Sequence, residues 1–288
     1  MGMPYALGAV RARTALGLMA PLALAGAALA STKVAATVGH DLVDATPTRL
    51  GELVVLAVAF AMTAGFNRLR IPTSTIQILV ASVVGTAVAA STGVQWGTIG
   101  ELAIVWVLAP FAAAALGFAG AKALGGVRGG TALGGGLLVV GCLVSFTMGA
   151  NDVSNASGAL VGVHVFGAHA AGLVCGAGIA AGVLITGRPL LDRVAFDIVE
   201  VDRTTAAAAQ LVQAAVVLVA VSFGLFTSLN QALVGGMAGA AGARGRDAVH
   251  TSTLLAIARG WVTGPPAAFA ASLIVSLLVR AGGGALAH

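Results

Sequence analysis

Apolar and polar stretches alternate along this chain at a spacing typical of helices that cross a membrane. A helix needs about 20 mostly apolar residues to span the roughly 30 Å hydrocarbon core of a bilayer, because it rises about 1.5 Å per residue. Residues 34–49 and 188–204 carry charged side chains and are expected to be polar connections. Full apolar segments are expected at residues 14–31, 102–121, 133–150, 170–187, 205–226 and 253–281.

Two polar breaks divide the remaining apolar stretches into short arms. The first break runs from Asn67 to Gln77 and contains Pro72, and the second spans Phe226 to Gln231. Backbone that is not helical is tolerated at membrane depth only where it lines a cavity or is covered by protein. We therefore predict two discontinuous or re-entrant helical hairpins, the first with arms at 51–66 and up to Ala90.

The two breaks belong to an internal repeat. Residues 73–89 align with residues 227–243 at an offset of 154, and eight of 17 positions are identical, including Thr, Ser and Gln. Further along, Trp106-x-x-x-Pro110 matches a second Trp-x-x-x-Pro at an offset of 155. Shared Ala and Gly content does not account for the polar identities. The sequence therefore predicts two membrane repeats, residues 1–128 and 129–288.

Composition places these segments in a bilayer. Hydrophobic residues make up 58% of the chain, only 9% of residues are charged, and the mean hydropathy is +1.00. Soluble domains carry roughly 25% charged residues. We expect an all-α polytopic protein of the plasma (inner) membrane, with the lipid bilayer around it and no soluble domain. The net charge of +5 is interpreted as an orientation signal, not as a nucleic-acid-binding surface.

The basic residues also predict how the repeats are oriented. If the first hairpin begins and ends on the side of loop 34–49, twelve basic residues fall on one side, and Lys33, Arg49 and Arg280 on the other. The richer side is then cytoplasmic. Corresponding loops fall on opposite faces, since loop 68–70 is basic and its counterpart 222–224 is uncharged. This predicts inverted-topology repeats, an architecture that places a binding site at the midplane between the halves.

A polar cluster follows the apolar run 133–150. Asn151, Asp152 and Asn155 lie within five positions of each other. An ionisable residue within a membrane segment is expensive and usually functional, although Asp152 could also end a helix at the bilayer surface. Asn and Asp oxygens suit a hard cation such as Na⁺, and Asp152 could instead take a proton. We predict a cation-coupling site at Asn151, Asp152 and Asn155, with Asp152 and Asn151 as Na⁺ ligands.

Together, the inverted repeat, the Gly149-Ala-Asn-Asp-Val-x-Asn-Ala156 motif and the Pro-x-Ser-Thr and Thr-Ser-x-x-Gln breaks resemble the inorganic phosphate transporter (PiT) family. The resemblance covers the chain from about residue 6 onward. It implies a secondary transporter that imports inorganic phosphate in symport with Na⁺ or H⁺, by alternating access, and it implies a homodimer. Some relatives carry sulfate. Many members have His where this chain has Gln77 and Gln231.

The hairpin breaks are the expected anion site. Helix N-termini at Thr73–Gln77 and Thr227–Gln231 would direct unpaired N–H groups and positive dipole ends at phosphate. Ser and Thr hydroxyls there could donate to the anion, or could simply cap short helices. The predicted phosphate-binding residues are Thr73, Ser74, Thr75, Gln77, Thr227, Ser228, Asn230 and Gln231.

The start of the chain departs from the family pattern. Members carry two Asn-Asp motifs, and subtracting the repeat offset of 154 from 151 and 152 places the first one before Met1. We expect that the start codon was assigned too late, and that the first repeat is incomplete at its N-terminus. The alternatives are a sulfate permease on the same fold and a truncated paralogue that does not transport. No enzyme is predicted, because the sequence has neither Gly-x-Ser-x-Gly nor His-Glu-x-x-His.

Overall fold

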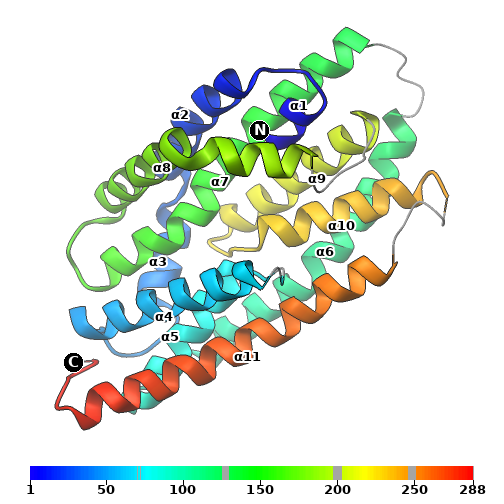
Figure 1. The fold of residues 1–288 in the computed structure, drawn as a ribbon. Helices are drawn as coiled ribbons and strands as arrows, with labels where there is room; N and C mark the ends of the chain where they lie inside the picture. Colours follow the sequence, from blue (N-terminus) through cyan, green and yellow to red (C-terminus); the bar gives the residue numbers. More distant parts are fainter. Residues whose placement is uncertain (70, 72, 125–129, 197–202, 246–250, 288) are drawn as a thin grey trace.

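The chain folds into long helices that run roughly alongside one another (Figure 1). The computed structural model describes residues 1–69, 71, 73–124, 130–196, 203–245 and 251–287. Within these ranges it contains α-helices and two isolated β-bridges, which confirms the predicted all-α class. The helices are α1 (Gly2–Ala6), α2 (Ala12–Ala30), α3 (Thr32–His40), α4 (Arg49–Arg68), α5 (Thr75–Ala90), α6 (Trp96–Leu124), α7 (Gly130–Gly162), α8 (Ala168–Phe196), α9 (Arg203–Ser222), α10 (Leu229–Gly242) and α11 (Thr251–Ala281).

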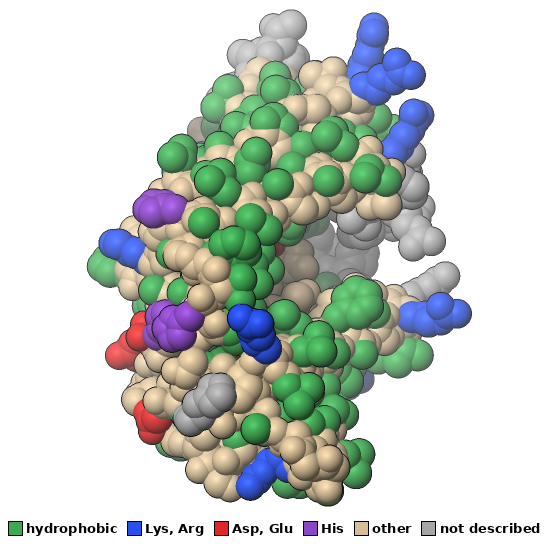
Figure 2. Space-filling view, turned by 90° about the vertical axis from the view of Figure 1, so that its left-hand side faces the viewer, with side chains coloured by type: hydrophobic (Ala, Val, Ile, Leu, Met, Phe, Trp, Pro, Cys, Tyr) green, Lys and Arg blue, Asp and Glu red, His purple; other side chains and the backbone are tan. Residues whose placement is uncertain are grey.

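Seven of the described helices are long and apolar enough to cross a membrane. Their outer surfaces are apolar: Phe60 is 77% exposed, Phe111 71% and Ile185 80%. Figure 2 shows hydrophobic side chains spread over the face turned to the viewer, with charged groups mainly at its edges. Apolar surface on this scale is stable only against lipid or a partner. The chain is a multi-pass membrane protein, as predicted.

The helices pack in three groups that meet at the centre of the molecule. One group holds α2, α7 and α8, a second holds α6, α9 and α10, and a third holds α4, α5 and α11 (Figure 1). Helix α7 also packs against α9, and so connects the first group to the second. Each hairpin is α-helical on both sides of its break: α4 and α5 form the first hairpin, and α9 and α10 form the second.

Helix bounds recur at the offset found in the sequence. Helix α9 begins and ends 154 residues after α4, and α10 begins 154 residues after α5. The N-caps Ser74 and Ser228 are separated by the same interval. The packing is reciprocal, because α5 lies against α11 and α10 lies against α6. The predicted boundary between the repeats, at residues 128 and 129, lies outside the described residues.

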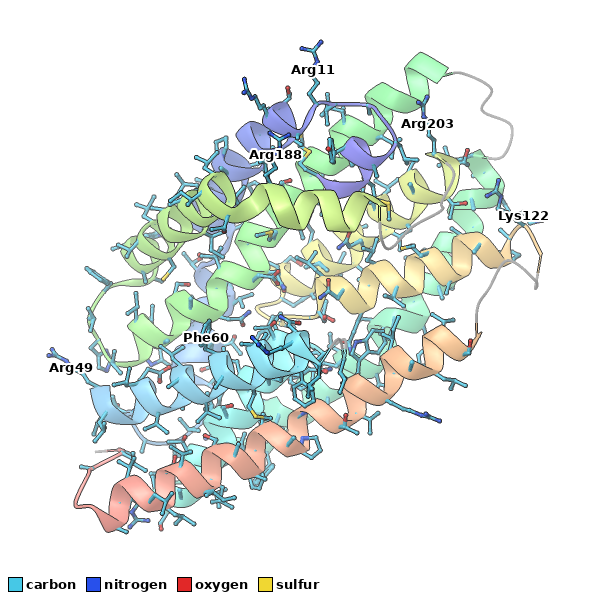
Figure 3. All side chains as sticks on the ribbon, in the orientation of Figure 1. Arg11, Arg49, Phe60, Lys122, Arg188 and Arg203 are labelled. Carbon is cyan, nitrogen blue, oxygen red and sulfur yellow. The ribbon has the colours of Figure 1, made fainter. Side chains whose placement is uncertain are left out.

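Both ends of the first hairpin lie on the same side of the molecule, as predicted. The residues before α4 pair with those after α5 through a bridge between Val43 and Val94. The Asp44 N–H donates to the Gly93 carbonyl at 3.0 Å. Figure 3 shows Arg49 at this end of the helices, and Arg11, Lys122, Arg188 and Arg203 toward the opposite end. This separation agrees with the two sides assigned from the basic residues.

Three predicted boundaries were wrong. Residues 188–204 were expected to be a polar connection, but α8 continues through residue 188 to Phe196. Residues 34–49 were expected to be a polar connection, but α3 occupies Thr32–His40, where Val34 and Ala35 are fully buried. The span 133–150 was expected to stop at the Asn-Asp motif, whereas α7 continues through it to Gly162. Asp152 is therefore inside a helix and does not end one.

Close contact between the backbones of α2 and α7 holds α7 in position near the Asn-Asp motif. A Cβ on Gly149 would collide with the Ala23 carbonyl of α2, and one on Gly26 would collide with the Phe146 carbonyl of α7. Small residues at membrane helix interfaces allow such an approach. The contact between α2 and α7 therefore lies two residues before Asn151, and it fixes the position of the Asn-Asp motif along the axis of the helix bundle.

Candidate functional site

Asn151 joins the centre of α7 to the break of the second hairpin. Its Nδ2 donates to the Thr227 carbonyl at 2.8 Å, and its Oδ1 accepts from the Thr227 N–H at 3.3 Å. Both residues are fully buried. The two bonds satisfy backbone groups of Thr227 that lie outside any helix, which is how a break can exist inside a membrane protein.

Asp152 and Asn155 extend this polar centre along α7. The Asn151 Nδ2 also donates to Asp152 Oδ1 at 2.7 Å. The Asn155 Nδ2 donates to the Asp152 carbonyl at 3.2 Å and to the Asn151 carbonyl at 3.5 Å. Asn155 is only 7% exposed. The structure therefore brings the three predicted cation-coupling residues together on α7, and Asn151 connects this cluster to Thr227 of the predicted anion site.

The two hairpin breaks end in matching N-caps. The Ser74 hydroxyl accepts from the Gln77 N–H at 3.4 Å at the start of α5, and the Ser228 hydroxyl accepts from the Gln231 N–H at 3.3 Å at the start of α10. The chain takes these turns because Ser is a favoured N-cap, and its hydroxyl replaces a missing helical acceptor. The capping prediction is confirmed for both Ser residues.

The first turns of α5 and α10 meet through their glutamines. Gln77 Nε2 lies 3.5 Å from Gln231 Oε1, and both side chains are buried. These residues are equivalent in the internal repeat, because they are 154 positions apart. Two helix N-termini with positive dipole ends are therefore linked across the molecule.

Not every predicted anion-site residue is buried here. Thr73, Ser74, Thr227 and Ser228 are buried with the two glutamines. Thr75 and Asn230 are exposed. Each is one of the first two residues of its helix, so its side chain points to a different side from that of the cap.

Two residues at the site were missed by the sequence reasoning. Trp106 of α6 donates from Nε1 to the Phe226 carbonyl at 3.0 Å, and Gln213 of α9 donates from Nε2 to the Leu229 carbonyl at 3.0 Å. Trp106 had been used only to align the repeats. Gln213 could have been noticed as a polar side chain inside an apolar segment, which is the usual sign of a functional or structural role in membranes.

Trp106→Phe is expected to loosen the second break. The ring is kept, but the Phe226 carbonyl loses its donor, which costs about 1 kcal/mol and lowers the melting temperature by about 2–4 °C. Thermal unfolding of the purified protein measures this. Trp96→Phe is the control, because Trp96 is 64% exposed and its replacement should leave the melting temperature unchanged. Equal losses in both variants would contradict the assigned role.

A surface cavity of about 360 Å³ lies next to the tip of the second hairpin. The tip is held by α3: Lys33 Nζ donates to the Ser222 carbonyl at 2.7 Å, and the Thr37 hydroxyl donates to the Gly224 carbonyl at 3.0 Å. Leu225, which lines the cavity, lies two residues before Thr227 in the sequence. Its lining residues are Thr37, His40, Asp41, Gln95, Thr98, Glu101, Phe223, Gly224 and Leu225.

Comparisons with known proteins find a matching family model and several relatives of this chain. A family model described as "Phosphate transporter family" matches residues 1–129 and 128–272. Over 295 residues the chain is 28% identical to the sulfate permease CysP of Bacillus subtilis (strain 168), covering 98% of this chain and 82% of that protein. It is 34% identical over 138 residues to the chloroplastic inorganic phosphate transporter 2-1 of Arabidopsis thaliana, covering 43% of this chain and 24% of that protein.

A solved structure has the same fold. It is described as "The sodium-dependent phosphate transporter" and superposes with a TM-score of 0.86, covering 97% of this chain and 96% of that chain. Sequence identity over the superposition is 19%, so the likeness concerns the arrangement of helices.

Proposed function

Because this chain belongs to the phosphate transporter family, we propose that it imports inorganic phosphate in symport with a cation, Na⁺ or H⁺, by alternating access. One observation carries the proposal. Asn151 links the Asp152 carboxylate to Thr227, immediately before the Ser228 cap of α10. A candidate cation site and a candidate anion site are therefore joined by one side chain.

The anion would bind at the N-termini of α5 and α10. Burying a phosphate away from water is prohibitive unless its charge is compensated and its oxygens are hydrogen-bonded. Unpaired N–H groups of the first helical turns and the hydroxyls of Thr73 and Thr227 supply donors, and both helix dipoles are favourable. Ser74 and Ser228 hold the turns in place through their caps.

Coupling follows from placing opposite charges in one low-dielectric site. A cation at Asn151, Asp152 and Asn155 makes the anion less costly to bury, and the anion does the same for the cation. By reciprocity, each ligand then raises the affinity for the other. Simultaneous binding is thereby favoured over binding of either ion alone.

The two halves would move around this site. Gln77 and Gln231 occupy equivalent repeat positions and touch each other, as residues near a pseudo-twofold axis do. Inverted repeats with discontinuous helices and a site between them are the arrangement that supports alternating access. The cavity beside the tip of the second hairpin would then be the approach from one side of the membrane.

Transport by the purified protein in lipid vesicles tests the proposal. Labelled phosphate is expected to accumulate when an inward Na⁺ or H⁺ gradient is imposed, and unlabelled phosphate should compete. Empty vesicles serve as the control. Absence of uptake under every gradient, with folded protein present, would contradict the proposed function.

Sulfate is the second candidate substrate. The alignment that covers 98% of this chain is to a sulfate permease, and both anions are tetrahedral oxyanions that helix N-termini can bind. The same vesicles should be loaded with labelled sulfate in parallel. Phosphate uptake that an equal concentration of sulfate leaves unchanged supports the first candidate, and the reverse pattern supports the second.

A further inference from the structure

Two histidines from different segments of the chain meet at the surface. His40 is the last residue of α3, and His164 lies in the connection between α7 and α8. Both side chains are exposed, and Figure 2 shows histidines at the surface of the molecule. Their ring centroids are 5.6 Å apart, and the ring planes are tilted by 27°. Among the described residues neither ring makes a hydrogen bond, so the ring nitrogens are open to a ligand.

Close packing of α3 on α7 brings the two rings together. A Cβ on Gly39 would lie 2.8 Å from the Gly158 carbonyl oxygen, and one on Gly162 would lie 2.9 Å from the Gly39 carbonyl oxygen. The backbones therefore meet one residue before His40 and two residues before His164. Small residues allow such an approach between membrane helices. The distance between the rings is thus set by the contact of two helices, which is a precise way to hold a site.

The backbone at His164 has a conformation that usually selects glycine. Its φ is +55°, and Ser91 is the other described non-glycine residue with a positive φ. The His164 N–H donates to the Val161 carbonyl at 2.9 Å, in the arrangement by which helices commonly end on a glycine. Helices α9 and α11 end in this way on Gly224 and Gly283. A β-carbon in this region costs stability that glycine avoids, and such an outlier points to a use for the side chain.

We propose that His40 and His164 bind one divalent transition-metal ion, for which Zn²⁺ is the probe. Neutral imidazole is a preferred ligand of Zn²⁺, Cu²⁺ and Ni²⁺. With Zn–N bonds of about 2.0–2.1 Å, each ring centre lies about 3 Å from the metal, so two rings at the tetrahedral angle are about 5 Å apart. The observed 5.6 Å requires only a small rotation of two exposed side chains. The described residues contain no group of three or more His, Cys, Asp or Glu suited to a metal, so water would complete the coordination.

The histidine pair lies at the rim of the surface cavity beside the tip of the second hairpin. His40 lines this cavity, and the chain continues from it to Arg49, on the side predicted to be non-cytoplasmic. An ion in the external medium can therefore reach the pair without crossing the membrane. Bound there with its waters, the ion would narrow the approach to the second hairpin. Metal binding depends on the two rings alone, whereas this effect on uptake rests on the proposed function.

Thermal unfolding of the purified full chain with ZnCl₂ tests the binding. The samples contain no phosphate and are kept at about pH 8, because a metal-binding imidazole must be neutral. Zn²⁺ is expected to raise the melting temperature saturably, whereas MgCl₂ should not, because Mg²⁺ prefers oxygen ligands. His40→Ala should increase the Zn²⁺ concentration for half the effect at least about tenfold, since removing even an indirect partner of a metal ligand has an effect of this size.

His164→Gly separates the ligand from the backbone conformation. Without metal it should raise the melting temperature by about 2–4 °C, because glycine adopts a positive φ without cost. It should nevertheless lose the Zn²⁺ effect as His40→Ala does, and a variant that fails to fold cannot give both results. His169→Ala is the matched control, because His169 is an exposed histidine of α8, and it should respond to Zn²⁺ as the parent does. No Zn²⁺ shift in the parent, equal Zn²⁺ shifts in the parent and both site variants, or equal stabilisation by MgCl₂ would overturn the proposal.

Uptake of labelled phosphate into vesicles separates the metal site from the proposed function. ZnCl₂ is expected to slow uptake by the parent and to leave uptake by His164→Gly unchanged. If Zn²⁺ stabilises the parent but does not slow its uptake, the metal site stands and its effect on the approach is overturned. If the parent takes up no phosphate at all, the proposed function fails, while the melting temperatures still decide the metal site.

Discussion

Replacing Asp152 by Asn is expected to lower cation-driven phosphate uptake by at least about a hundredfold. Two opposite unit charges about 4 Å apart interact by roughly 4 kcal/mol at an effective dielectric constant of about 20. About 1.4 kcal/mol corresponds to a factor of ten in affinity, so losing this attraction removes most cation binding at working concentrations. The substitution keeps the shape of the side chain and an oxygen that can accept from Asn151.

The measurement is initial uptake of labelled phosphate into vesicles that contain equal amounts of folded protein. Asp44→Asn is the matched control, because it makes the same chemical change at an exposed position outside α7 that does not line the cavity proposed as the approach. Its uptake should remain within about twofold of the parent, as expected when an exposed charge is screened by water and salt. Full activity in Asp152→Asn would exclude this carboxylate from coupling.

The hairpins could be predicted from the sequence because their signal is local. A polar break between two apolar arms has few explanations inside a membrane, and Ser74 and Ser228 are followed by the turns that they cap. The repeat gave a second, independent indication, since the same residues recur 154 positions later. Helices α4 and α9 then begin and end at that same interval.

The continuation of α7 through the Asn-Asp motif could not be predicted from local pattern. A cluster of Asn and Asp after an apolar run normally indicates the membrane surface, because such side chains are expensive in lipid. Here the cost is offset by Thr227, which is 76 residues away in sequence and bonds Asn151 through both backbone groups. A contact between residues so far apart in the sequence cannot be detected in the hydrophobic periodicity of either segment.

The sequence analysis did not assign the two remaining site residues, for a related reason. Trp106 and Gln213 each donate one hydrogen bond to the backbone of the second hairpin, near its break. Whether a lone polar group in an apolar helix meets such a carbonyl depends on helix rotation and packing. Helical geometry alone, however, could have separated the buried cap Ser74 from the exposed Thr75 beside it, because consecutive residues point to different sides.

Asn151→Ala is expected to destabilise the folded protein more than any other single truncation in the motif. The Thr227 N–H and carbonyl would both lose their partner inside the bundle, and each unsatisfied buried group costs about 1–3 kcal/mol. A total of several kcal/mol should lower the melting temperature by about 5–10 °C, at roughly 2–4 °C per kcal/mol for a domain approaching this size. Phosphate uptake should be lost as well, because the break before α10 is no longer held against α7.

Thermal unfolding and uptake on the same preparations check this, and Asn155→Ala provides the comparison. Asn155 bonds only the carbonyls of Asn151 and Asp152 on its own helix, which the helical backbone can satisfy without it. Its truncation should lower the melting temperature by no more than about 2–4 °C, the shift for roughly 1 kcal/mol. Because both changes remove the same amide, the difference between them measures what Asn151 contributes through its two bonds to Thr227 and its bond to Asp152. Equal melting temperatures in the two variants would show that this connection does not hold the second break in place.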